Sequence, residues 1–180
     1  MIAKNDATDG TNNSFYWGKN LSGKDVTGIT NIEADTDYVG EGKTYGTDFT
    51  TWSSGPVIDF NGNANTAALI AAYAEHGVSM DTRDMCSVLN TFNQAEQAAG
   101  RSADWYVPAC GQLALIYLNK AKINTALSWI GGKTFVSDDY WSNSEYDSDK
   151  GWRIDLSSGK ISYYYAKSES LRVRFVRDLQ

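Results

Sequence analysis

The C-terminal part of the chain, from Tyr140 onward, concentrates side chains whose chemistry is that of recognition. Tryptophan and arginine alternate there with Asn, Asp and Ser, and three tyrosines follow one another from Tyr163 to Tyr165. Tyrosine supplies rigid amphipathic contact area, and Ser and Asn supply adaptable hydrogen bonds. This composition predicts a binding surface that is carried by an apolar frame.

Catalytic chemistry has few candidates in this chain. There is one histidine, His76, and no Gly-x-Ser-x-Gly sequence, which limits acid–base and serine-nucleophile mechanisms. Cys86 or Cys110 could act as a nucleophile with His76, but both lie in stretches with a helical pattern, where thiols are usually buried and inert. We place His76 in the last turn of a helix before Gly77, a structural role. We therefore expect no enzyme and no cofactor.

The two cysteines leave two states open, one disulfide or two free thiols. They are too few for a four-cysteine zinc site. The sequence Asp147-Ser148-Asp149-Lys150-Gly151 places carboxylates at alternate positions, which could hold a hard cation together with backbone carbonyls. It lacks the later acidic ligand of an EF-hand loop. A solvated acidic loop is the preferred interpretation, and no metal site is predicted.

Composition bounds the classes of protein that remain. The chain has 180 residues, 42% of them apolar and 21% charged, which suits one packed domain over residues 1–180. A net charge of −6 without a basic run disfavours nucleic acid and anionic membrane surfaces as partners. The longest apolar run, 67–74, is too short to span a bilayer, so we expect no membrane insertion. Residues 1–6 contain no hydrophobic signal segment, which leaves a cytoplasmic or phage-borne protein, or one trimmed before this start.

Residues 1–62 are rich in Gly, Thr, Asn and Asp and predict an irregular β-rich part, with short strands at 15–17, 38–39 and 57–60. The next stretch predicts a helix over 63–77, capped by Asn65 or Thr66 and ended by Gly77. Its expected apolar face contains Ala67, Ile70, Ala71 and Ala74. A second helix is expected over 87–99. A third begins after Pro108 and continues through Leu127 to the pair Gly131-Gly132.

From Phe135 onward the pattern is that of strands. Trp152, Ile154 and Leu156 alternate with Arg153, Asp155 and Ser157, so the apolar set should face inward and the polar set outward. Ser158-Gly159 is typical of a hairpin, followed by a strand over 161–165 and a last strand over 172–177. The fold class is therefore α+β, with helices packed on small antiparallel sheets.

Three adjacent tyrosines on one strand cannot all face the same way, because successive side chains alternate between the two sides. A packed sheet with one solvent-facing tyrosine would explain the run. A tyrosine-rich recognition patch would explain it as well, and we adopt this second interpretation.

Several short motifs then occur in a specific order along residues 63–177. They are Trp105-Tyr106-Val107-Pro108, Gln112-Leu113, Ile123-Asn124-Thr125-Ala126-Leu127, Ile130-Gly131-Gly132, Tyr140-Trp141-Ser142, Trp152, Ser158-Gly159 and Arg172-Val173-Arg174. In order and spacing this set resembles the variable proteins of diversity-generating retroelements, in particular those of gut Bacteroides-type bacteria and their phages. The same motifs occur in related surface proteins that are not diversified.

The resemblance implies a C-type lectin fold of the kind found in formylglycine-generating enzymes, with ligand-binding residues in a variable region, here 140–177. In such systems a reverse transcriptase copies a template with errors at adenines, so residues encoded by AAY codons vary. These codons can yield Asn, Asp, Tyr, Ser, Arg, Leu, Ala or Gly, but not Trp, Lys, Glu, Gln or Met. The positions that the resemblance marks as ligand-binding are Asp147, Asp149, Arg153, Asp155, Tyr163, Tyr164, Tyr165, Ser168 and Leu171, with Asn143 and Tyr146 added.

The same codon rule marks scaffold positions, which are Trp141, Lys150, Trp152, Lys160, Lys167 and Glu169. The resemblance thus implies a non-catalytic protein that recognises an external protein or glycan ligand on a cell surface. It would be found outside the cell, on a cell surface or on a phage particle, and oligomerisation stays open. Replacing the three tyrosines with alanine should then abolish binding and leave the melting temperature nearly unchanged.

Two alternatives remain beside this one. The first is a structural or adhesive domain of a surface fibre or phage tail, without a diversified site. The second is an enzyme of the formylglycine-generating type. It is disfavoured because nothing near Cys110 repeats the cysteine pair of that site, and a shared fold does not carry activity over.

Overall fold

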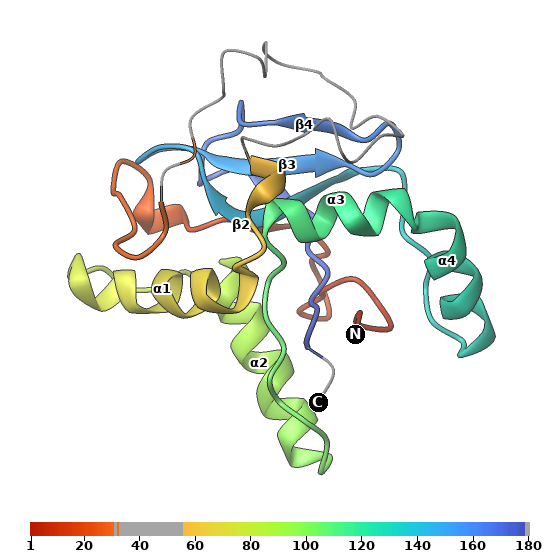
Figure 1. The fold of residues 1–180 in the computed structure, drawn as a ribbon. Helices are drawn as coiled ribbons and strands as arrows, with labels where there is room; N and C mark the ends of the chain where they lie inside the picture. Colours follow the sequence, from red (N-terminus) through yellow and green to blue (C-terminus); the bar gives the residue numbers. More distant parts are fainter. Residues whose placement is uncertain (31, 33–55, 179–180) are drawn as a thin grey trace.

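The computed structural model describes residues 1–30, 32 and 56–178, and the strand expected at 38–39 lies outside these residues. The described part contains helices and short antiparallel strands, which confirms the α+β class (Figure 1). Its helices are α1 Gly62–Glu75, α2 Met85–Ala98, α3 Cys110–Leu118 and α4 Lys120–Trp129, with 3-10 turns at Lys19–Leu21 and Pro56–Ile58. Its strands are β1 Phe15–Tyr16, β2 Asp139–Glu145, β3 Gly151–Asp155, β4 Lys160–Ser162 and β5 Ser170–Leu171.

The central sheet is antiparallel with the strand order β2-β3-β4, and β1 pairs separately with β5. Trp141 lies opposite Arg153 on β2 and β3, and Ile154 lies opposite Ile161 on β3 and β4. The hairpin expected at Ser158-Gly159 is confirmed: Gly159 has a φ of 76°, a left-handed conformation that favours glycine. The sheet therefore brings the two halves of the predicted 140–177 region side by side.

A hydrophobic cluster covers each side of this sheet. Adjacent residues of a strand point to opposite sides, and Tyr140 belongs to one cluster while Trp141 belongs to the other. Trp152 and Ile154 pack toward α3 in the first cluster, as their alternation predicted. The second cluster joins α1 and α2 to buried residues of the first thirty, among them Phe15 and Trp17. Residues 1–30 thus contribute to the same core.

Helix α1 lies close to its expected range and ends before Gly77, whose φ is 62°. Its buried face was predicted correctly only at Ile70, which is partly buried and packs on the second cluster. Leu69, Ala72 and Tyr73 are buried instead of the expected alanines. Asn65 and Thr66 are buried as well and do not cap the helix, since the N-cap is Asn61. The helix is rich in alanine, so the alanine spacing carried little information about which side faces the core.

The third predicted helix is interrupted at Asn119, where α3 ends and α4 begins. Asn119 has ψ near 9°, and its side-chain amide donates to the carbonyl of Leu115 at 2.9 Å, a local bond that competes with the regular helix pattern. The strand expected at 57–60 is instead a 3-10 turn that starts at Pro56. Beyond Leu171 the last expected strand is reduced to isolated bridges, such as Tyr106 to Val176.

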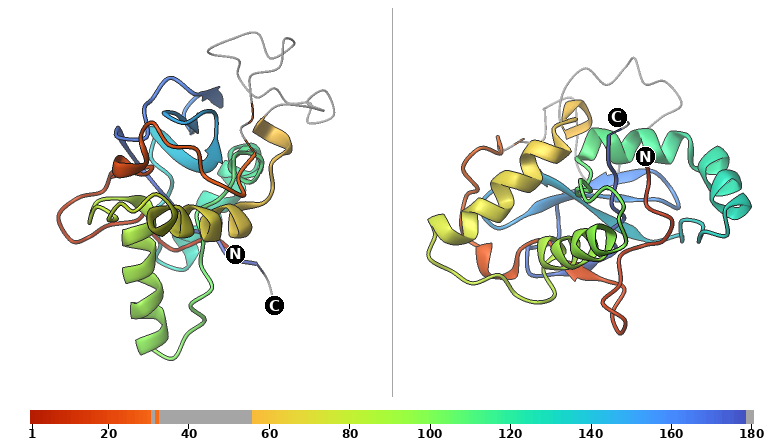
Figure 2. Two further views of the ribbon diagram at one scale, coloured as in Figure 1. Left: turned by 90° about the vertical axis from the view of Figure 1, so that its left-hand side faces the viewer. Right: turned by 90° about the horizontal axis from the view of Figure 1, so that it is seen from below.

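Across the described ranges, no helix combines the length and apolar character needed to cross a membrane. Figure 1 shows β3 and β4 on the upper side of the molecule and α2 with the chain termini on the lower side. The view from below in Figure 2 shows α2 and both termini on the side opposite the hairpin.

Candidate functional site

The run of three tyrosines begins where β4 ends, at Ser162, so strict alternation does not govern its side chains. Tyr163 packs on the cluster that contains Trp152, with the two ring centroids 5.2 Å apart and nearly perpendicular. Its ring is also stacked on Tyr146 at 3.9 Å, with planes only 9° apart. These contacts anchor both Tyr146 and Tyr163 to the core.

Tyr164 extends this stack to the surface. Its ring centroid is 5.2 Å from that of Tyr163, the planes are 22° apart, and the residue is 49% exposed. We call Tyr146, Tyr163 and Tyr164 the tyrosine stack. Because aromatic residues hold their shape at low entropic cost, a supported and exposed ring of this kind is suited to contact a ligand.

Tyr165 points to the other cluster. Its ring meets Trp141 edge-on at 6.4 Å, and the guanidinium of Arg153 lies 5.1 Å from its centroid. The three tyrosines thus divide into one exposed ring and two rings that pack on opposite cores. These contacts argue against the prediction that all three can be replaced without loss of stability, since Tyr163 and Tyr165 each pack on a buried cluster.

The acidic turn after β2 uses its carboxylates locally. Asp147 Oδ1 accepts hydrogen bonds from the backbone amides of Asp149 at 2.8 Å and Lys150 at 2.7 Å. The Asp149 carboxylate accepts from the Ser22 hydroxyl. Within the part of the chain that the structure describes, no group of three or more His, Cys, Asp or Glu is placed to hold a metal ion. The turn therefore presents half-buried carboxylates beside the tyrosine stack.

A fully buried ion pair lies beneath this turn. Lys167 Nζ donates to the Glu145 carboxylate and to the carbonyl oxygens of Lys24 at 2.8 Å and Ser148 at 2.9 Å. The ammonium also lies 4.8 Å from the ring centroid of Trp17, and both charged side chains have zero exposure. Burial raises the pKa of Glu145 and lowers that of Lys167, and each charge opposes the shift of the other.

This ion pair holds three segments together: the N-terminal loop around Lys24, the turn after β2, and the segment that carries the tyrosines. Sequence reasoning marked Lys167 as scaffold but gave no signal for its partner Glu145. Lysine and glutamate are separated by 22 positions, and only the folded chain brings them together.

Two predicted ligand-binding residues are corrected by their burial. Asn143 has zero exposure, and its amide donates to the carbonyls of Gly62 at 2.6 Å and Val107 at 2.8 Å. Arg153 is 8% exposed and forms a cross-strand ion pair with Asp139. Arg153 was expected to face solvent, but the second cluster covers that side of the sheet. Neither side chain is placed to meet a ligand.

The remaining predicted positions lie nearer the surface. Ser168 is exposed, whereas Leu171 is half-buried on β5 and packs on the second cluster. Asp155 lies in the β3–β4 hairpin: burial alone would raise its pKa, but hydrogen bonds from Ser157 and Ser158 lower it overall. The structure therefore brings Tyr164, Ser168 and the turn Asp147–Asp149 to the accessible part of the 140–177 region.

Both cysteines are free thiols with zero exposure. Burial raises the pKa of Cys86 and of Cys110, which favours the protonated thiol over the thiolate. His76 is the C-cap residue of α1, and its Nε2 lies 2.7 Å from the carbonyl oxygen of Asp25. The two thiols are therefore packed inside the core, and the imidazole joins the end of α1 to the N-terminal loop.

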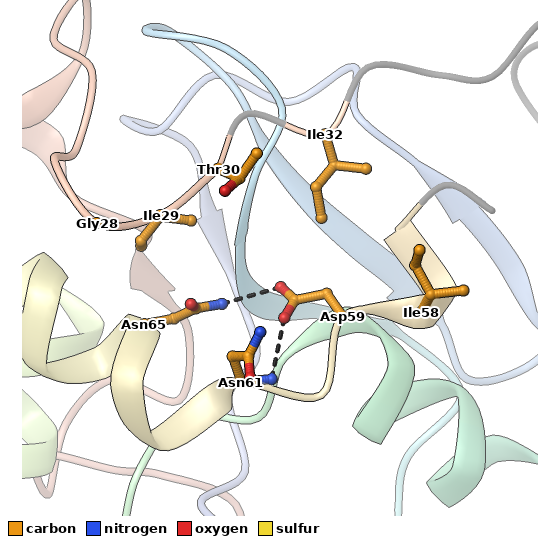
Figure 3. Close-up of a pocket in the computed structure, with 8 residues that line it drawn as sticks. All are labelled: Gly28, Ile29, Thr30, Ile32, Ile58, Asp59, Asn61 and Asn65. Atoms are coloured by element: carbon orange, nitrogen blue, oxygen red, sulfur yellow. Dashed lines mark hydrogen bonds between the residues drawn. The ribbon is translucent and has the colours of Figure 1, made fainter.

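Sequence reasoning missed the buried carboxylate Asp59, which lines a cavity of about 290 Å³ (Figure 3). Asp59 accepts hydrogen bonds from the backbone N–H of Asn61 at 3.0 Å, from Asn65 Nδ2 at 2.9 Å and from the Ser144 hydroxyl at 2.5 Å. It thereby fastens the start of α1 to β2. We expected Asp59 within a strand and therefore did not expect its carboxylate to join α1 to β2. Asn61, two residues later, is a turn-forming residue that could have indicated the end of a strand here.

No protein-family model matches this chain, and none of the curated proteins does. A solved structure, a fimbrial protein from Bacteroides ovatus, is similar with a TM-score of 0.55 and 16% sequence identity. The match covers 90% of this chain and 33% of the fimbrial protein, so this chain spans about a third of the length of that protein. At this identity the similarity concerns the fold alone.

Proposed function

We propose that this protein is a non-catalytic ligand-binding domain of a surface structure, and that the tyrosine stack is the centre of its contact face. The observation that carries the proposal is Tyr164, 49% exposed and stacked on Tyr163, which is itself held by Trp152. An exposed aromatic ring on a rigid support resembles the residues that dominate binding energy in protein interfaces. The external ligand would be a protein or a glycan.

We further propose that the fold is of the C-type lectin kind and that retroelement mutagenesis diversifies the contact face. Burial supports this: Trp141, Trp152 and Lys167, which AAY mutagenesis cannot create, are fully buried. Tyr164 and Ser168, which it can create, are exposed, although Glu169, which it cannot create, is exposed as well. Asn143 and Arg153 fall outside the proposed contact set because both are buried.

A fixed adhesive or structural domain of a surface fibre is the second candidate. The fold similarity to a fimbrial protein favours it, because it requires no diversification. Under this alternative the tyrosine stack would meet one constant partner.

The coding DNA distinguishes these two candidates. We expect the stretch that encodes residues 140–177 to have a neighbouring, near-identical copy that differs only at template adenines. This outcome would mark the varied codons directly and should include those of Tyr164 and Ser168. Mismatches spread over all bases, or no copy at all, would overturn the diversified site and leave the fixed surface domain.

A binding screen tests the contact face itself. On arrays of glycans and of cell-surface proteins, we expect Tyr164→Ala to weaken binding at least tenfold, because it removes the one exposed ring of the stack. Phe60→Ala is the matched control, since Phe60 is also an aromatic residue and is 42% exposed. Equal loss in both variants, or none in Tyr164→Ala, would place the contact face elsewhere.

A further inference from the structure

A large groove lies on the side of the molecule away from β4. It has a volume of about 680 Å³ and runs between the N-terminal segment and α2. Its apolar walls include Ile2, Val88, Phe92, Trp105, Ile130 and Phe175. The Phe92 ring meets Trp105 edge-on, with centroids 5.6 Å apart, and it meets Phe175 at a tilt of 49°, with centroids 5.3 Å apart, so the floor is a packed set of aromatic rings. None of these residues belongs to the proposed contact face.

An apolar knob stands at the rim of this groove, where α4 ends. Trp129 is 84% exposed and Ile130 is 62% exposed. Ile130 also lines the groove, so the knob and the groove lie on the same face of the molecule. A tryptophan side chain that is so exposed to solvent is unusual in a folded domain, and tryptophan is one of the residues that most often anchor protein interfaces.

We propose that the groove receives Trp129 from a second copy of this chain, so that two copies form a symmetric dimer. A knob beside a groove on one face is self-complementary: a twofold axis places each knob over the groove of the other copy. The aromatic floor suits an indole, because aromatic rings favour edge-on and offset contacts with one another.

The area that the two knobs could bury agrees with this pairing. An aromatic side chain buries about 150–250 Å², so two Trp129–Ile130 knobs and the walls they cover amount to roughly 1,200 Å², the lower range for a specific complex. The groove is lined by Lys4 and Arg101 as well as by Asp6 and Glu96, so its charges balance and do not oppose the entry of an apolar side chain.

The dimer would place its two contact faces on the outside. Figure 1 shows β4 on the opposite side from α2 and the N-terminus, which border the groove. Burying the groove side of each copy leaves both tyrosine stacks accessible. Two linked sites raise the apparent affinity for a surface that carries repeated ligands.

Sedimentation velocity of the purified protein between about 1 and 200 μM tests the dimer. An interface near the lower size limit of specific complexes should bind weakly, so the series extends to high concentration. We expect the wild-type protein to pass from the mass of one chain to that of two. Trp129→Ala should weaken association at least tenfold. Ala95→Trp should do the same from the groove side, because Ala95 is exposed on α2 and lines the groove. Tyr164→Ala, on the opposite face, is the control and should associate like the wild type.

Cross-linking fixes the geometry. Copies with Ser128→Cys, an exposed position that leaves Trp129 in place, mixed with copies with Ala95→Cys should form a disulfide between chains, while the buried Cys86 and Cys110 stay reduced. A protein that stays monomeric at 200 μM would overturn the dimer. So would a Trp129→Ala variant that associates like the wild type, or a bridge that forms only within a chain carrying both substitutions. No ligand enters these measurements, so their failure leaves the proposed function untouched.

Discussion

Replacing Lys167 with methionine is expected to lower the free energy of unfolding by about 3–5 kcal/mol, the cost of removing one partner of a buried ion pair. Methionine keeps the length of the side chain but leaves the Glu145 carboxylate buried without its cation. It also removes the donor for the carbonyls of Lys24 and Ser148. Urea denaturation followed by tryptophan fluorescence measures the loss.

Two further variants separate charge from packing. Lys122→Met is the control, because Lys122 is an exposed residue of α4, and it should change stability by less than about 0.5 kcal/mol. The double variant Glu145→Gln with Lys167→Met should be more stable than Lys167→Met alone, since no isolated charge then remains in the core. A loss below about 1 kcal/mol in Lys167→Met would contradict the strength assigned to the pair.

The three tyrosines should respond differently to alanine. Tyr164→Ala is expected to change the free energy of unfolding by less than about 0.5 kcal/mol, because its ring is half exposed. The triple variant should lose about 4 kcal/mol. In it, Tyr163 leaves the cluster around Trp152 and Tyr165 leaves the one around Trp141, and each partly buried ring contributes about half of a full aromatic truncation.

Denaturation of the three single variants and the triple variant, alongside the binding screen, measures both effects. Tyr163→Ala should weaken ligand binding as well as stability, because it removes the support of Tyr164. The assignment of Tyr164 to the surface would fail if its single variant unfolded as readily as Tyr163→Ala. Stability retained in the triple variant would instead place all three rings outside the core.

Much of the secondary structure followed from local pattern. Glycines with positive φ at 77, 100 and 159 ended helices and turned the hairpin where their positions predicted. The alternation of Trp152, Ile154 and Leu156 correctly assigned the inward side of β3. Two predictions from local pattern were wrong. The third helix is interrupted at Asn119, where the side chain bonds to the preceding turn, and the strand expected at 57–60 is a 3-10 turn that begins with Pro56.

The candidate site depended on contacts between distant parts of the chain. Alternation identified Arg153 as opposite to Trp152, but it could not reveal that the sheet is covered on both sides. Asn143 likewise belongs to a polar type that is common on surfaces, and only its bonds to Gly62 and Val107 show that it stays inside. Burial, and not residue type, separates the contact face from its support.

The sequence by itself determined the α+β class, the hairpin and the recognition-type composition of residues 140–177, because these depend on residue type and short-range spacing. The tertiary structure decided which of those residues a ligand can reach. It divided three adjacent tyrosines between two cores and the surface, and it brought Lys167 to Glu145 beneath the acidic turn. The physical reason is that exposure and ion pairing are set by which distant segments pack together, and short-range spacing carries no information about that packing.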